Sequence, residues 1–240
     1  MGSGWLSRPA LADIPRMDAI GKRARPRVRK LFADAGLPYP CRSIFLRAFK
    51  ADDELELWAA QRHGEPMTRV QTYSICARSG ELGPKRRQGD EQVPEGCYHI
   101  HRYNAWSGFH MSMRVDYPNA SDRVRGHKHD LGGAIMVHGG CATIGCIPIE
   151  DGPIEEVFLA SLDGRRKGGR LTPIHIFPTR LDEAGLRELK THPDATPDRL
   201  TLWRELQPVY EAFETTKIVP DVEIDRATGT YGLVEAAPAV

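Results

Sequence analysis

The sequence lacks long apolar runs and an excess of either charge. No window approaches the roughly 18 consecutive apolar residues of a membrane-spanning helix, so we expect no transmembrane segment. The 33 lysines and arginines are balanced by 32 acidic residues. Without an overall positive field, nucleic acid is not an expected partner. We interpret the basic runs at 22–29 and 165–170 as solvated surface.

A leader peptide and a disulfide framework are also missing from the pattern. Residues 1–17 contain no continuous apolar stretch, so no signal peptide is visible. Five cysteines are too few, and odd in number, for a disulfide-stapled scaffold. Cys41, Cys76 and Cys97 stand apart in strand-like or turn-like contexts, and we expect them to be buried free thiols.

Length and periodicity indicate an α+β protein. The 240 residues, 40% of them hydrophobic, can bury a sizeable core. Alternation and turn residues predict strands at 43–49, 55–60, 69–77, 97–104, 109–115, 134–138 and 172–177, and a hairpin at 221–234. Apolar spacings of three and four predict helices at 151–164, 179–192, 196–216 and, interrupted near Pro26, at 17–36. Long polar loops are expected at 78–96 and 116–133.

The stretch IMVHGGCATIGCIPIED (Ile135–Asp151) gathers one histidine and two cysteines among glycines. His138, Cys141 and Cys146 could be metal ligands, but a second ligand pair is missing apart from two histidines in a polar loop. A disulfide between Cys141 and Cys146 is also possible. Both interpretations explain less of the spacing than a nucleophile beside its base.

The nucleophile interpretation assigns a structural or chemical role to most residues of the motif. His138 ends a predicted strand, which would fix its ring, and Gly139 lets the chain turn back tightly. Gly145 leaves room for a substrate beside Cys146, and backbone amides from Thr143 onward could face an oxyanion. Cys141 is a weaker candidate that spacing alone does not exclude.

The motif VHGGCATIGC resembles that of the L,D-transpeptidase (YkuD-type) catalytic domain family, and most closely its YafK-like branch with a shortened H-G-x-C-x-[ST]-x-G-C motif. The similarity extends over roughly residues 40–235. It includes KRRQGDEQVPEGCYHI, SMRVDYPNASD, IEEVFLA and PIHIFPTRL. It implies a β-rich, sandwich or barrel-like core with C-terminal helices packed on it. We therefore expect an N-terminal helical segment at 1–40 and a catalytic domain with a helical extension at 41–240.

The resemblance implies roles for individual residues. Cys146 matches the nucleophile and His138 the general base. Thr143 takes the Ser/Thr position and Gly145 the glycine before the nucleophile. The wider family usually has histidine at Ile144, and arginine within the segment that here reads IPI (147–149).

The resemblance also implies a substrate, a mechanism and a compartment. Cys146 would attack an L,D-amide bond at diaminopimelate in a peptidoglycan stem peptide, forming a thioester that an amine or water resolves. A hydrolase of the same family that cleaves such bonds, or that releases a cell-wall-linked protein, is an alternative, and a His/Cys metal-binding or redox module is a second. No cofactor or metal is expected, and the compartment would be the bacterial periplasm or cell envelope.

Two polar residues outside the motif are further candidates for substrate binding. Tyr117 and Asn119 lie in DYPNASD, which could contact a substrate or simply form a Pro-Asn turn.

Overall fold

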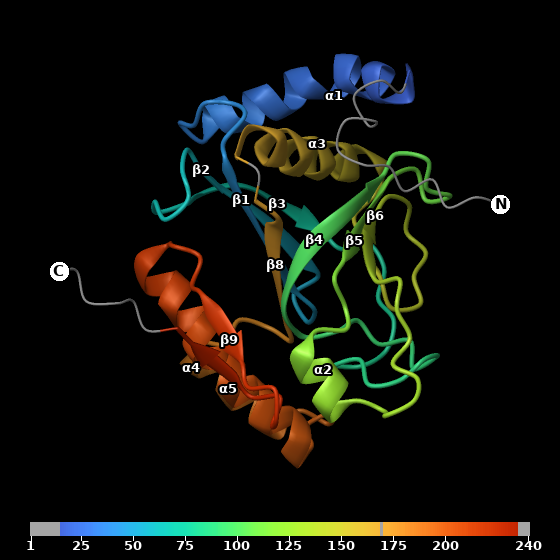
Figure 1. Cartoon of the computed structure of the whole chain (residues 1–240), viewed down its shortest axis with the longest axis vertical. Coiled ribbons are helices and arrows are strands. Elements are labelled where there is room, and N and C mark those ends of the chain that lie inside the picture. Colours follow the sequence, from blue (N-terminus) through green and yellow to red (C-terminus); the bar gives the residue numbers. More distant parts are fainter. Residues whose placement is uncertain (1–14, 169, 235–240) are drawn as a thin grey trace.

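The computed structural model describes residues 15–168 and 170–234 (Figure 1). Its helices are α1 (Pro15–Asp34), α2 (Ala120–Arg125), α3 (Asp151–Gly168), α4 (Glu183–Thr191) and α5 (Pro197–Thr216). Its strands are β1 (Ser43–Phe49), β2 (Glu54–Ala60), β3 (Thr68–Ser74), β4 (Gly96–Asn104), β5 (Ser112–Val115), β6 (Met136–His138), β7 (Ile147–Pro148), β8 (Thr172–Phe177), β9 (Val222–Ile224) and β10 (Tyr231–Leu233). The predicted α+β class is confirmed.

Eight strands form one mixed sheet in the order β3-β2-β1-β8-β4-β5-β6-β7. Two neighbouring pairs, β1–β8 and β6–β7, are parallel, and the others are antiparallel. The sheet is a single curled layer, so the barrel-like form of the expected core describes it better than two facing sheets (Figure 1). The site motif lies at one edge, because β6 and β7 are the last two strands.

Helices cover both faces of the sheet. On one face α3 packs on the strands and α1 packs on α3; α4 and α5 lie on the other face (Figure 1). Strand β1 is buried along its whole length for this reason. Leu46 contributes to the core beneath α3, whereas Phe49 packs in a second core with Trp203 of α5. The two-residue alternation of a strand thus supplies two separate cores.

Helix α1 differs from the prediction because it continues through Pro26 without a break. Proline removes one helical hydrogen bond, but Pro26 lies on the exposed face, where water can take the freed carbonyl. The buried stripe through Ala24, Val28 and Phe32 has helical spacing and holds the helix against its neighbour. Packing therefore outweighs the local cost of the proline.

The basic run within α1 is also more than solvated surface. Arg23 and Arg27 both pair with Glu155 of α3, and Arg25 pairs with Asp163 of α3 at 3.1 Å. Glu155 is buried, so its carboxylate needs these partners. The expectation of a free solvated face is wrong here, since the run docks one helix on another.

The predicted loop at 116–133 contains α2, which sequence periodicity did not reveal. Asn119 caps this helix: its side chain accepts the Asp122 amide, and the Asp122 carboxylate accepts the Asn119 amide. This reciprocal pair is a capping box. The six-residue helix is short enough to be hidden in a polar loop.

Helices long and apolar enough to cross a membrane are absent from the residues that the structure describes. The segments predicted at 1–40 and 41–240 are described only from residue 15 and up to residue 234.

Candidate active site

Strand pairing places His138 and Cys146 near the same edge of the sheet. In the parallel pair β6–β7, Val137 lies opposite Ile147 and His138 opposite Pro148. Cys146 directly precedes β7, so it lies next to the strand neighbour of β6, near the level of His138. Two residues eight apart in sequence thus lie near each other at the edge of the sheet.

The ring of His138 is held in one tautomer. It is only 2% exposed, and its Nδ1 lies 2.5 Å from the carbonyl oxygen of Gly139. A carbonyl can only accept, so Nδ1 carries the proton and Nε2 of the neutral ring is free to accept one. The Phe109 ring, itself 50% exposed, packs on the imidazole with ring centroids 4.7 Å apart. Burial lowers the pKa of His138, which keeps the ring neutral near pH 7.

The thiol of Cys146 is neutral as well. Burial raises its pKa, and the nearby backbone of Met136 and the charge of Lys85 only partly oppose this. Its Sγ lies 3.6 Å from the carbonyl oxygen of Ala134, and within the described chain no hydrogen bond joins it to His138. The resting pair is therefore a thiol and a neutral imidazole rather than an ion pair.

Thr143 fastens the turn that carries Cys146. Its Oγ1 accepts the amide of Cys146 at 2.8 Å and that of Gly145 at 3.2 Å, and it donates to the Cys146 carbonyl at 2.9 Å. The hydroxyl thus needs both its donor and its acceptor capacity, which explains a Ser/Thr requirement at this position. Gly145 has a φ of +123°, and a Cβ there would meet the Gln92 carbonyl at 3.0 Å.

The same hydrogen bonds revise the expected oxyanion site. The amides of Gly145 and Cys146 already donate to Thr143, and the amide of Gly139 donates to the Met111 carbonyl at 3.1 Å. The amides of Thr143 and Ile144 make no hydrogen bond to the part of the chain that the structure describes. Within residues 143–146, the amides of Thr143 and Ile144 are therefore the donors that remain available to an oxyanion.

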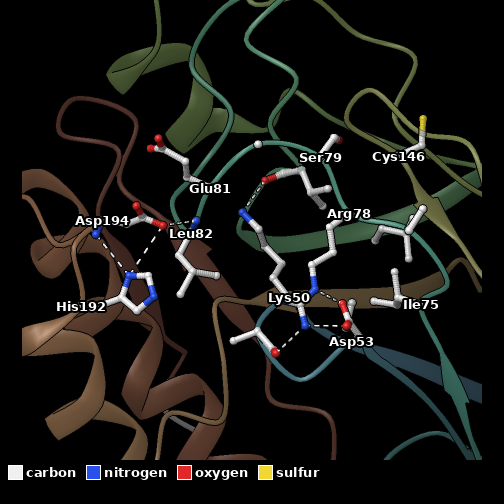
Figure 2. A pocket seen from close by; sticks show the side chains of 16 residues that line it. Lys50, Asp53, Ile75, Arg78, Ser79, Glu81, Leu82, Cys146, His192 and Asp194 are labelled. Atoms are coloured by element: carbon white, nitrogen blue, oxygen red, sulfur yellow. Dashed lines mark hydrogen bonds and ion pairs between the residues drawn. The ribbon is translucent and has the colours of Figure 1, made fainter.

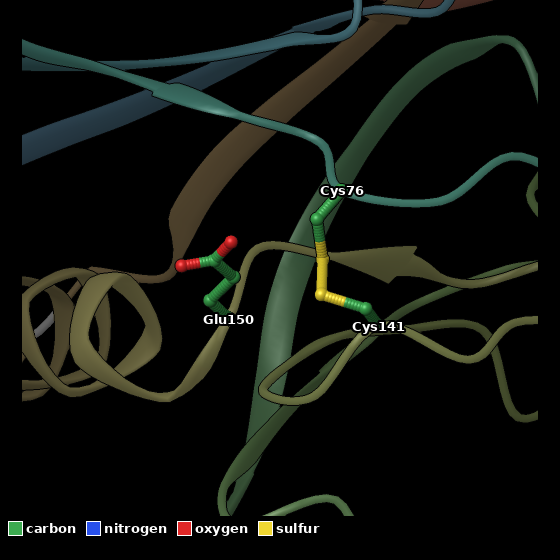
Figure 3. Close-up of side chains that lie close together, drawn as sticks. All are labelled: Cys76, Cys141 and Glu150. Carbon is green, nitrogen blue, oxygen red and sulfur yellow. A yellow bond between two sulfur atoms is a disulfide. The ribbon is translucent and has the colours of Figure 1, made fainter.

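Cys141 forms a disulfide with Cys76 (Figure 3). The expectation that Cys76 is a free thiol is wrong, whereas Cys41 and Cys97 are free as expected. The bond joins the active-site loop to the segment that leaves β3, across 65 residues of sequence. Glu150 lies beside the two sulfur atoms, but sulfur atoms bonded to each other are not thiolates and do not suit a metal ion.

A second set of contacts holds the loop from the side of α3. The amide of Gly140 donates to Asp151 at 2.9 Å, at the first residue of α3. His110 lies 4.0 Å from the Asp151 carboxylate and 2.7 Å from that of Glu155. The sequence gives no direct signal for His110, because it comes from a turn 28 residues before His138.

A cavity of about 740 Å³, including its open mouth, lies beside Cys146 (Figure 2). Its lining includes Ile147 next to the cysteine, Arg78 and Glu81 from the segment after β3, and Asp194 beyond α4. In Figure 2, Cys146 lies at one rim and Asp194 at the opposite one. Neither Tyr117 nor Asn119 lines it.

Tyr117 and Asn119 are engaged within the protein instead. The Tyr117 hydroxyl donates to the Leu131 carbonyl at 3.0 Å. The side-chain Nδ2 of Asn119 donates to the Cys97 carbonyl at 3.1 Å and to the Tyr231 hydroxyl at 2.8 Å. Its side-chain oxygen caps α2. The interpretation of DYPN as a structural turn fits these contacts.

The chain is 31% identical over 183 residues to YafK, a candidate L,D-transpeptidase from two strains of Escherichia coli. The match covers 75% of this chain and 70% of YafK. This chain belongs to the L,D-transpeptidase family, in its YafK-like branch. No family model matches it.

Solved structures with a distant likeness to this family member include two from other bacteria. The helical cell shape determining protein Pgp2 of Campylobacter jejuni is 15% identical, with a TM-score of 0.45 over 77% of this chain and 73% of its own. An L,D-transpeptidase of Xylanimonas cellulosilytica is 13% identical, with a TM-score of 0.33 over 62% of this chain and 68% of its own.

This L,D-transpeptidase family member differs from the wider family's motif at Ile144, where histidine is usual, and within 147–149, where arginine is usual. The structure explains the second difference. Ile144 is 78% exposed two residues before Cys146, so its side chain is open to a ligand. Ile147 and Ile149 are fully buried in the core beneath α3. An arginine at either position would bury a charge, and apolar residues are therefore required by packing here.

Proposed function

We propose that this chain is a cysteine-dependent peptidoglycan enzyme that cleaves an L,D-amide bond at diaminopimelate and passes the acyl group through a thioester on Cys146. The observation that carries the proposal is the bond from His138 Nδ1 to Gly139, which leaves Nε2 as a proton acceptor at the sheet edge next to which Cys146 lies. Membership of the L,D-transpeptidase family supports the substrate class.

The proposed reaction begins from the neutral pair. The Sγ of Cys146 attacks the carbonyl carbon while its proton passes to Nε2 of His138. The carbon–nitrogen bond of the tetrahedral adduct then breaks, and the same proton goes to the departing amine. An acceptor amine or water then attacks the thioester carbon and gives a proton to Nε2. The carbon–sulfur bond breaks, and the Nε2 proton passes to Sγ, which restores the thiol and the neutral imidazole.

The proposed compartment is the bacterial periplasm or cell envelope. The disulfide between Cys76 and Cys141 supports it, because such bonds persist in oxidising compartments and are rare in reducing ones. The peptidoglycan substrate lies in the same place.

Digestion of muropeptides followed by mass spectrometry tests the proposal. Transfer predicts a crosslinked muropeptide dimer. Hydrolysis predicts a trimmed muropeptide monomer, or a peptide fragment released from a protein that had been linked to the wall. Cys146→Ala should abolish either product, and His138→Ala should reduce it by about 10²- to 10⁴-fold.

The disulfide supplies a matched control. Cys141→Ala removes the other cysteine of the motif, and it should retain more activity than Cys146→Ala because Cys141 is already bonded to Cys76. Full activity of Cys146→Ala would disprove the nucleophile assignment. Stoichiometric zinc that is lost in Cys141→Ser would favour the metal-binding alternative.

A further inference from the structure

The position of the cavity relative to the two reactive residues indicates which part of a substrate it takes. Cys146 and Ile147 line the cavity, and His138 does not. The proposed base must give its proton to the departing amine, so that amine lies on the His138 side of the sulfur. The cavity then receives the other half of the substrate, the acyl-donor peptide.

The basic side chains that line this cavity are Lys50, Arg78 and His192, and the hydrogen-bond donors of Lys50 are already all used. The Lys50 side chain is 9% exposed, and its ammonium donates to the Gly83 carbonyl at 2.7 Å, the Val93 carbonyl at 3.1 Å and Glu95 at 3.0 Å. An ammonium has three protons, so none remains for a ligand. Lys50 holds the loop around the cavity rather than a substrate.

His192 is engaged at its Nδ1, which accepts the Asp194 backbone amide at 3.2 Å, and Arg78 is the cavity's guanidinium. Its side chain is 56% exposed, and its Nε and Nη2 donate to Asp53, with Nη2 also 2.9 Å from the Ala51 carbonyl. Its Nη1 makes no hydrogen bond within the described residues. Asp53 thus fixes the plane of the guanidinium while one edge keeps its donors, as Figure 2 shows.

The acidic groups of the cavity are occupied by the protein. Glu81 pairs with Arg199 at 3.2 Å, and Asp194 accepts the Leu82 amide at 2.8 Å. The hydroxyl of Ser79, which follows Arg78 in the wall, has no partner within the described chain. The Nη1 of Arg78 and the hydroxyl of Ser79, cavity groups without a partner among the described residues, can therefore donate hydrogen bonds to a ligand's acceptor atoms.

We propose that Arg78 binds a free carboxylate of the acyl-donor peptide and makes the enzyme select donors that carry this charge. The inference rests on the proposed function, and it adds the chemical feature by which the donor is recognised. Stem peptides carry such carboxylates beside the amide bonds, and in some forms they are converted to amides. An amide would remove the charge and weaken a charge-assisted hydrogen bond.

The test compares two donor peptides, one with free carboxylates and one with the same groups amidated, in wild type, Arg78→Gln and Arg78→Lys. Wild type should prefer the free form, and Arg78→Gln should lower kcat/KM for it by about 10- to 100-fold while leaving the amidated form unchanged. Most of the loss should lie in KM. Arg78→Lys should fall between the two, since it keeps the charge but loses the planar fork. Singly amidated donors then identify the carboxylate concerned.

Arg62→Gln removes an arginine that lies outside the cavity, and it should behave as wild type. Alkylation of Cys146 by iodoacetamide should be equal in all variants, which shows that the site is intact. Equal preference for both donors in wild type, or the same fall for both in Arg78→Gln, would overturn the inference. Turnover of neither donor by wild type would instead overturn the proposed function.

Discussion

The two reactive side chains are both uncharged at rest, and this determines how their reactivity should depend on pH. Burial raises the pKa of the Cys146 thiol and lowers that of the His138 imidazole. A thiolate–imidazolium pair would need the opposite shifts. The proton therefore moves only when a substrate carbonyl is present, as in a neutral nucleophile–base pair.

Alkylation of Cys146 by iodoacetamide should follow from this neutral resting state. Its rate should be low at pH 5–7 and rise past pH 8.5, the ordinary thiol pKa, because only the thiolate reacts. The rate is measured by mass spectrometry of the Cys146 peptide, with Cys146→Ser as the blank. A rate that is already at its plateau at pH 5 would show a preformed ion pair.

At the scale of elements, the active-site loop is held from two sides. The disulfide joins it to the end of β3, and Asp151 joins it to the start of α3. The loop between β6 and β7 has little regular structure of its own, since β7 has two residues. Its geometry depends on these two attachments more than on local propensity.

Removal of the disulfide should cost stability as well as loop order. A crosslink across 65 residues restricts the unfolded chain by about 4 kcal/mol in the loop-entropy relation. Urea unfolding of a Cys76→Ser, Cys141→Ser double variant should show most of this loss. Thiol titration of the unfolded wild type should count three free cysteines before reduction and five after it. Five before reduction would contradict the bond.

The sequence predicted the elements with strong local signals. The β1–β2 hairpin, helix α3, helix α5 with its cap at Thr196, and the stop of β8 before Pro178 agree with it. The pairing of Cys76 with Cys141 could not be read, because connectivity depends on contacts between distant segments. Arg78 was missed for the same reason, since nothing in its local sequence brings it to the cavity of Cys146.

The family motif predicted the position of the site better than its contacts. Thr143 and Cys146 are joined by hydrogen bonds, and His138 lies in the neighbouring strand β6, while their roles in a reaction stay predictions. The hydrogen-bond partners of the loop amides are set by the Thr143 rotamer and by folding against β5, neither of which has a sequence pattern. The expected amide donors therefore needed correction.

At the scale of the whole molecule, a buried histidine makes the fold sensitive to acid. His175 lies in β8 between Phe45 and Phe177, and burial together with the charge of Arg47 lowers its pKa to about 3. The unfolded chain has the ordinary value near 6.5. Between these two values the unfolded state binds the additional proton, so stability falls as pH falls.

Replacement of His175 by leucine should remove part of this acid sensitivity. The wild type should lose up to about 1.4 kcal/mol per pH unit from this group between pH 6 and pH 4. Thermal or urea unfolding of both proteins at several pH values measures the difference. The exposed His127 provides a control, and His127→Gln should follow the wild type. Parallel curves for His175→Leu and wild type would contradict the assignment.

The bond between His138 and the Gly139 carbonyl imposes an order on the proposed reaction. Because Nδ1 is hydrogen-bonded to the Gly139 carbonyl, Nε2 alone exchanges protons with the reactants. It first gives a proton to the departing amine and later takes one from the incoming acceptor. Both groups need the same place beside Nε2, so the first must leave before the second can enter. The enzyme should therefore follow ping-pong kinetics, in which the acyl-enzyme persists after the amine product leaves and before the acceptor binds.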